Sequence, residues 1–225
     1  MNIAIPSAKT DLGISDANQQ WVITAYTLAF GSLLLLGGRI GDYVGRKKIF
    51  IIGLLGFAGA SALGGIAANQ GMLYGSRALQ GVFGALLAPA ALAIISETFK
   101  VPSERAKAFG VFGAISGGGA AIGLILGGTL TEYFSWRWCL GVNTPIAIMA
   151  AILALKFVHE SKAEGDNTYD IPGVITATAG LFSLTYGFNE AATKGWSSTP
   201  TISFLVAAVL LLVIFVVIET QVSNP

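Results

Sequence analysis

The sequence is poor in charge and in cysteine. Only 11% of its 225 residues are Asp, Glu, Lys or Arg, whereas soluble domains carry about a quarter, so we expect the chain to lie in a lipid bilayer. Its one cysteine, Cys139, excludes an internal disulfide and a cysteine-based zinc site. The net charge of +1 leaves no basic surface for a nucleic-acid partner.

The sequence also lacks the motifs of common enzymes. The single histidine, His159, has no cluster of Cys, His or carboxylate residues near it at metal-ligand spacing. No glycine-rich phosphate loop with a lysine is present. We therefore expect neither an enzyme nor an ATP-driven pump, and no catalytic residue, cofactor or bound metal.

What the sequence does have is long apolar runs. A helix needs about 20 mainly apolar residues to cross the hydrocarbon core, and seven runs come close to that length or exceed it. They are 21–38, 49–68, 72–96, 108–130, 138–155, 171–191 and 201–219. The 29 glycines suit helices that pack closely in a bilayer. These features predict an all-α polytopic membrane protein.

The Lys and Arg residues are distributed unevenly between the two sides of these runs. Nine of them occupy one set of alternate connections and three occupy the other. Because Lys and Arg are enriched in cytoplasmic connections, we expect the nine-residue side to face the cytoplasm. The C-terminus of this chain would then lie inside the cell and its N-terminus outside, in a plasma membrane.

A group of glycines and charges connects the first two runs, at residues 38–48. By residue type it is a positively charged turn, in which the outer glycines bend the chain and Asp42 accepts backbone N–H groups at a helix start. Its spacing, G-x3-D-x2-G-R-K, resembles the cytoplasmic loop signature of the major facilitator superfamily. The matching residues are Gly38, Asp42, Gly45, Arg46 and Lys47. The resemblance implies a secondary transporter whose two halves rock about a central site, with Asp42, Arg46 and Lys47 as gating residues.

Arg77 is the one ionisable residue that falls well inside a predicted span. A charge at such a depth is costly unless it faces a cavity or a partner, although a long side chain near a helix end can also reach the interface. Gln80 lies on the same helical face, which favours an inward polar patch. The pattern R-x2-Q-G, completed by Gly81, resembles the fourth-helix motif of the superfamily, whose arginine is implicated in proton coupling.

Glycines recur through the run at 108–130. Their spacing indicates close packing of this helix against another. The fuller pattern resembles the fifth-helix antiporter signature of the superfamily, with its glycines at Gly110, Gly119, Gly123, Gly127 and Gly128. Leu124 stands where that signature has a proline, so any kink here must come from the glycines.

Two further stretches, 20–31 and 136–145, resemble the fourteen-helix drug:proton antiporter branch, the multidrug efflux carriers. This resemblance implies export of small, hydrophobic, drug-like compounds in exchange for protons. The tryptophans in these stretches also suit anchoring at the membrane interface. A facilitator or uptake carrier on the same scaffold remains an alternative, because a fold does not fix a substrate. The span count leaves a heptahelical receptor as a remote alternative.

The resemblance covers helices two through eight of fourteen. It implies the outer end of a missing first helix and an outer loop at 1–20, a five-span N-terminal bundle at 21–155, a cytoplasmic linker at 156–170, two extra spans at 171–219 and a cytoplasmic end at 220–225. Carriers of this kind form their substrate site between two repeats. We therefore expect an incomplete carrier whose partners are the missing C-terminal half, the small-molecule substrate, protons and the lipid bilayer.

Overall fold

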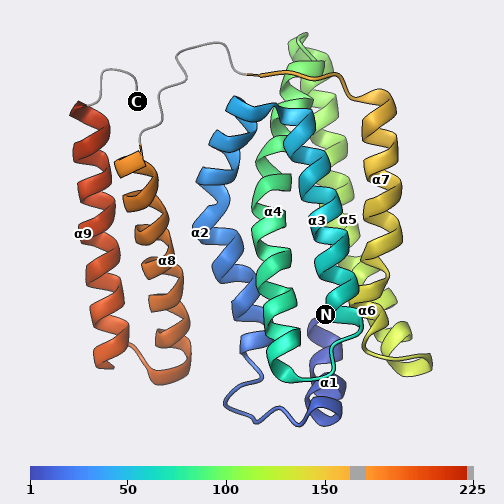
Figure 1. Ribbon diagram of the computed structural model, residues 1–225, viewed down its shortest axis with the longest axis vertical. Helices are drawn as coiled ribbons and strands as arrows, with labels where there is room; N and C mark the ends of the chain where they lie inside the picture. Colours follow the sequence, from blue (N-terminus) through green and yellow to red (C-terminus); the bar gives the residue numbers. More distant parts are fainter. Residues whose placement is uncertain (163–170, 222–225) are drawn as a thin grey trace.

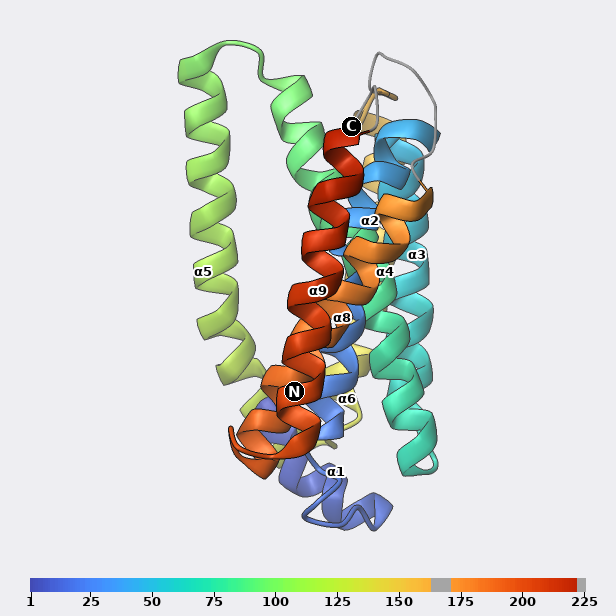
Figure 2. The same ribbon diagram turned by 90° about the vertical axis from the view of Figure 1, so that its left-hand side faces the viewer.

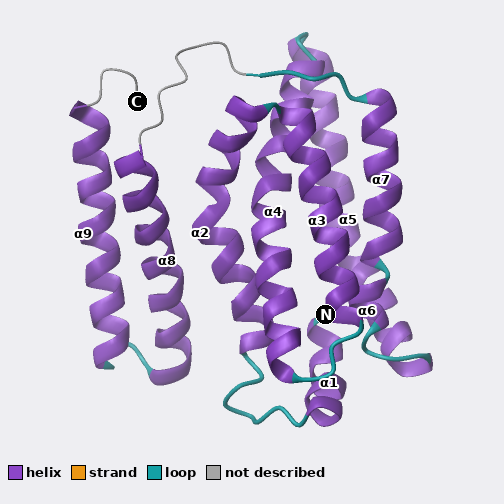
Figure 3. Cartoon of the chain, viewed as in Figure 1, coloured by secondary structure: helices purple, strands orange, loops and turns teal. Residues whose placement is uncertain are grey.

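The computed structural model describes residues 1–162 and 171–221, and this part of the chain contains helices and loops only (Figure 3). The prediction of an all-α protein is confirmed. The helices are η1 (Asn2–Ala4), α1 (Ile5–Leu12), α2 (Trp21–Val44), α3 (Arg46–Gly65), α4 (Gln70–Thr98), α5 (Pro102–Tyr133), α6 (Trp138–Gly141), α7 (Asn143–Phe157), α8 (Ile171–Lys194) and α9 (Thr199–Gln221). Residues 163–170 of the expected linker lie outside the described residues.

The long helices run roughly side by side along the vertical of Figure 1. Helix α4 lies at the centre, where it packs against α2 and α3, and α7 packs on the far side of α3. Helices α8 and α9 form a hairpin that contacts the rest of the chain mainly through α2. Helix α5 stands apart from α2 and α4 for most of its length, as Figure 2 shows.

Small residues allow α2 and α4 to approach each other closely. A Cβ atom on Gly37 would lie 2.1 Å from the backbone oxygen of Ala85, and one on Gly81 would lie 2.4 Å from the backbone oxygen of Tyr26. Any side chain at these two positions would therefore force the helices apart. This is the kind of small-residue contact on which membrane helices rely, because lipid supplies no hydrophobic force between them.

Six helical segments in the described residues are long and apolar enough to cross a membrane. They are Trp21–Val44, Arg46–Gly65, Gln70–Thr98, Pro102–Tyr133, Trp138–Phe157 and Thr199–Gln221. Seven spans were expected from the sequence, and the one at 171–191, which corresponds to α8, is not among these six. Helix α8 opens with Pro172 and Gly173 and carries Asn189, Glu190 and Lys194 in its last turns, so its apolar stretch is shorter than the helix itself.

The signature at residues 38–48 is mostly helix rather than loop. Helix α2 continues to Val44 and α3 begins at Arg46, so that Gly45 alone separates them. The expectation that Asp42 caps a helix start is therefore wrong, because Asp42 lies in the last turn of α2. Gly38 is likewise helical, and it faces Pro89 of α4 rather than bending the chain.

The short helix α1 is fastened to the connection between α5 and α6 at the lower end of Figure 1. Trp136 is only 4% exposed, and its indole Nε1 donates to the Asp11 carboxylate at 3.0 Å. Arg137 donates to the same carboxylate and to the backbone oxygen of Ala67, the latter at 3.0 Å. Its guanidinium also lies over the Trp136 ring. The expected interfacial anchor Trp136 is thus a buried contact between elements, whereas Trp138 and Trp196 are exposed.

Candidate functional site

Gly45 forms the turn between α2 and α3 with a backbone that favours glycine. Its φ of 125° lies in a region that L side chains rarely adopt. A Cβ atom at this position would also lie 2.7 Å from a carboxylate oxygen of Glu160. The backbone conformation therefore favours glycine here, and a larger residue would also displace the Glu160 carboxylate.

Arg46 is the centre of a chain of charges at this turn. Its guanidinium contacts one Asp42 carboxylate oxygen through Nε at 3.0 Å and Nη2 at 2.9 Å. The Nη1 atom lies 3.5 Å from Glu97 at the end of α4, and Glu97 also pairs with Lys100 at 3.2 Å. The place of Glu97 in this chain of charges was not predicted from the sequence. Its position next to Lys100 at the end of a span was the available signal.

The segment after α7 closes over the start of α3. The Glu160 carboxylate accepts backbone N–H groups of Lys47 at 3.0 Å and Lys48 at 3.2 Å, which satisfies donors that a helix start leaves free. The negative charge also suits the positive end of the helix dipole. The backbone N–H of Arg46 donates to the backbone oxygen of Ser161 at 2.9 Å. Lys47 Nζ donates to the backbone oxygen of Leu155 at 2.9 Å. Glu160 was not predicted from the sequence.

Arg77 lies in a network that joins α2, α3 and α4. Its Nε donates to the backbone oxygen of Val22 at 3.0 Å, and its Nη1 donates to the Gln80 side-chain oxygen. The Gln80 amide then donates to Ser61 Oγ at 2.6 Å, and both of these residues are almost fully buried. The Arg77 guanidinium carbon lies 4.5 Å from the centre of the Tyr26 ring. Hydrogen bonds and a cation–π contact thus replace the hydration of this charge.

Arg77 and Gln80 open on a cavity of 420 Å³ between α5 and the other helices. This volume lies within the range of small-molecule sites. The lining also includes Tyr26 of α2, Asn143 of α7 and the glycines Gly119, Gly123 and Gly127 of α5. The structure therefore brings the fourth-helix motif and part of the fifth-helix glycine pattern together around one space.

Most of the glycine face of α5 has no close neighbour in the part of the chain that the structure describes. Cβ atoms added at Gly110, Gly119, Gly123 and Gly128 would meet nothing within 4 Å, and one at Gly127 would meet only Cys139 Sγ at 3.9 Å. The expectation of a tight glycine contact is therefore wrong for these residues. The physical reason is the position of α5, which stands apart from α2 and α4 and turns part of this face to the cavity.

The chain is similar along its whole length to known transport and resistance proteins. It is 53% identical to the puromycin resistance protein pur8 of Streptomyces alboniger, over 100% of this chain and 44% of that protein. It is 38% identical to the cephamycin export protein CmcT of Amycolatopsis lactamdurans, over 98% of this chain and 46% of that protein. It is 32% identical to the multidrug transporter protein MdtP of Bacillus subtilis, over 99% of this chain and 41% of that protein. The chain thus spans less than half the length of these relatives.

These relatives confirm the resemblance to drug efflux carriers. The Major Facilitator Superfamily matches residues 1–223, almost the whole chain. The superfamily consists of transporters rather than enzymes, and the six apolar helices described above agree with a multi-pass membrane protein. Sequence motifs, helical architecture and family match lead to one assignment: the chain belongs to the Major Facilitator Superfamily.

Proposed function

We propose that this chain is part of a carrier that exports small, hydrophobic, drug-like compounds from the cytoplasm in exchange for protons. The observation that carries the proposal is the Arg77–Gln80–Ser61 network, which holds a cation at the wall of a cavity between membrane helices. Charged groups at such depth mark substrate or ion pathways. Three of the relatives, a puromycin resistance protein, a cephamycin export protein and a multidrug transporter protein, support the substrate class by their names.

The ion pairs at the α2–α3 turn support a gate at that end of the carrier. Asp42 and Glu97 both pair with Arg46, so movement of α2 relative to α4 would change these contacts. Lys47 is attached to the end of α7 through the Leu155 oxygen. We place this end in the cytoplasm, from the distribution of Lys and Arg. In the carrier, these residues would hold the cytoplasmic side in one conformation until substrate or protons bind.

A facilitator or uptake carrier is the second candidate, and two observations favour it. Leu124 replaces the signature proline and is 55% exposed on α5. Among the described residues that line the 420 Å³ cavity, none is an Asp or Glu that could carry a proton. Proton exchange would therefore need a carboxylate outside this lining.

The experiment uses a chimera, because the relatives are more than twice as long as the region that this chain matches. Residues 1–225 would replace the matching segment of the puromycin resistance protein, with which they align along 100% of their length. The chimera, its Arg77→Ala variant and an empty vector would be compared for survival in puromycin and for efflux of the drug. We expect resistance and efflux from the chimera and their loss in the variant.

Coupling is tested separately in vesicles that contain the chimera. Drug exchange for protons predicts that an imposed proton gradient accelerates puromycin movement and that a protonophore abolishes the acceleration. Equal rates with and without the gradient would favour the facilitator. No puromycin movement by a correctly inserted chimera would contradict the proposed export.

A further inference from the structure

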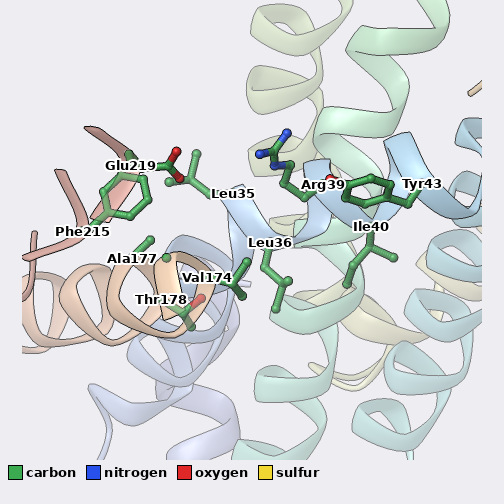
Figure 4. A pocket seen from close by; sticks show the side chains of 11 residues that line it. Leu35, Leu36, Arg39, Ile40, Tyr43, Val174, Ala177, Thr178, Phe215 and Glu219 are labelled. Atoms are coloured by element: carbon green, nitrogen blue, oxygen red, sulfur yellow. The ribbon is translucent and has the colours of Figure 1, made fainter. Parts of the chain in front are cut away.

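Two cavities follow the seam between α2 and the α8–α9 hairpin. The first, of 340 Å³, lies near the α2–α3 turn and is shown in Figure 4. The second, of 550 Å³, continues down the same seam. Both are lined by Leu36, Val174 and Thr178, so they adjoin each other. They lie on a different face of α2 from the Arg77 cavity, and no proposed transport residue lines them.

The seam is apolar for about the depth of one membrane leaflet. Its lining on α2 extends from Tyr43 to Ala29, and the part from Arg39 down to Ala29 is about 15 Å long at 1.5 Å per residue. Half of a hydrocarbon core of about 30 Å is also about 15 Å. Ser32 is the polar residue of the α2 wall in the lower cavity, and its hydroxyl is already bonded to the Leu28 backbone oxygen. The groove thus has the length and the chemistry to hold an acyl chain.

The upper end of this groove carries one positive and one negative side chain. Figure 4 shows Arg39 of α2 and Glu219 of α9 on the same side of the pocket, with Val174 and Leu36 below them. Within the described residues, neither forms an ion pair, and the Arg39 guanidinium carbon lies 6.0 Å from the centre of the Tyr43 ring. Both charges are therefore available to a ligand that enters from the surrounding lipid.

We propose that this groove binds phosphatidylethanolamine. Its phosphate would accept hydrogen bonds from the Arg39 guanidinium, because arginine matches phosphate geometry. Its primary ammonium would donate to the Glu219 carboxylate, and one acyl chain would follow the seam towards Phe182. Phosphatidylglycerol offers a phosphate but no cation for Glu219. Phosphatidylcholine offers a cation without an N–H donor, so it would bind more weakly.

Contacts at the lower end hold the hairpin against α2, whereas towards the upper end the two cavities lie between α2 and the hairpin in the described residues. Thr24 Oγ1 donates to the Asn189 side-chain oxygen at 2.7 Å. The Trp21 and Tyr186 rings lie with their centres 6.4 Å apart. Occupation of the seam would fix the distance between α8 and α2 near the gating turn, so the lipid would act as a structural part of the bundle.

The test measures lipid retention by the full 225-residue chain purified in detergent. Native mass spectrometry would follow binding from equal mixtures of phosphatidylethanolamine, phosphatidylglycerol and phosphatidylcholine. We expect preferential retention of phosphatidylethanolamine.

Arg39→Gln should weaken binding of all three lipids about tenfold, because each loses its phosphate partner. Glu219→Gln should remove the preference and leave phosphatidylglycerol bound as well as phosphatidylethanolamine. Lys48→Gln, an exposed cation at the same end but outside the groove, is the control and should change nothing.

A second pair of variants tests the acyl-chain groove. Thr178→Phe would fill the region that the two cavities share, and Thr176→Phe is the matched control on the same helix outside both linings. Loss of lipid in the first variant alone, with equal melting temperatures, supports the site. Preference of the unmodified chain for phosphatidylglycerol, equal retention of phosphatidylcholine, or unchanged binding in both Arg39→Gln and Glu219→Gln would overturn it. None of these readouts depends on transport.

Discussion

Arg46 contacts a single oxygen of Asp42 with two of its nitrogens, Nε at 3.0 Å and Nη2 at 2.9 Å. The two residues belong to different helices, and only Gly45 separates those helices. The same guanidinium reaches Glu97 through its third nitrogen at 3.5 Å. One cation therefore links the end of α2 to the start of α3 and to the end of α4.

Asp42→Asn should weaken this link without disturbing insertion, because the pair is partly exposed and isosteric asparagine fits the same space. A double-mutant cycle of Asp42→Asn and Arg46→Gln should give a coupling free energy of about 0.5–1 kcal/mol, as expected for an exposed pair. In the chimera, we expect Asp42→Asn to reduce puromycin efflux while surface expression stays normal. Glu97→Gln is the companion variant. Unchanged efflux in both would contradict a gating role for this turn.

Ser61→Ala should destabilise the bundle through Gln80. The variant leaves the buried Gln80 amide without its acceptor, which costs about 1–3 kcal/mol. Thermal unfolding in detergent should detect the loss. Transport should also fall, because Gln80 holds the Arg77 guanidinium. Thr129→Ala is the control, since its hydroxyl contacts only backbone oxygens of exposed α5. Equal melting temperatures for both variants would argue against the network.

Valine substitutions should separate packed glycines from open ones. Gly37→Val and Gly81→Val place side-chain atoms against backbone oxygens of the facing helix, so each should cost about 1–3 kcal/mol or more through overpacking. Gly119→Val and Gly123→Val meet open space in this chain and should leave the melting temperature almost unchanged. A large fall in the melting temperature of the Gly119→Val or Gly123→Val chain would contradict this and show that these glycines do pack against another helix.

The contact between Asp11 and Trp136 should respond to acid. Hydrogen bonds lower the pKa of the Asp11 carboxyl below its usual value, the one from Trp136 most and the one from Arg137 next. Because the pKa is lowered in the folded state, this contact contributes fully to the free energy of unfolding above the ordinary aspartate pKa of about 4. The contribution is lost as the pH falls through the lower pKa of the folded state. A variant that retains Trp136 as its one tryptophan should therefore change its fluorescence below about pH 4. Asp11→Asn should abolish that transition, and its persistence would place the titrating group elsewhere.

Local composition was enough to predict the long apolar helices and the family. Long apolar runs have no stable alternative to the helix in lipid, because each backbone polar group must be bonded within the segment. The spacing of Gly38, Asp42, Gly45, Arg46 and Lys47 predicted the superfamily before any contact was known, and the family match confirms it. The pair Arg77 and Gln80 was placed on one face from helical periodicity alone, and the structure shows them hydrogen-bonded there.

Which groups meet across the bundle depended on the tertiary structure, because those contacts join residues far apart in the chain. Glu160 reaches the start of α3, and Ser61 completes the Arg77 network, yet neither residue stands out in its own stretch of sequence. The glycines of α5 illustrate the limit most clearly. Their spacing predicts that another helix can pack closely against α5, but the position of the neighbouring helices decides whether one does. In the described residues that face borders a cavity instead, while Gly37 and Gly81 form the tight contact.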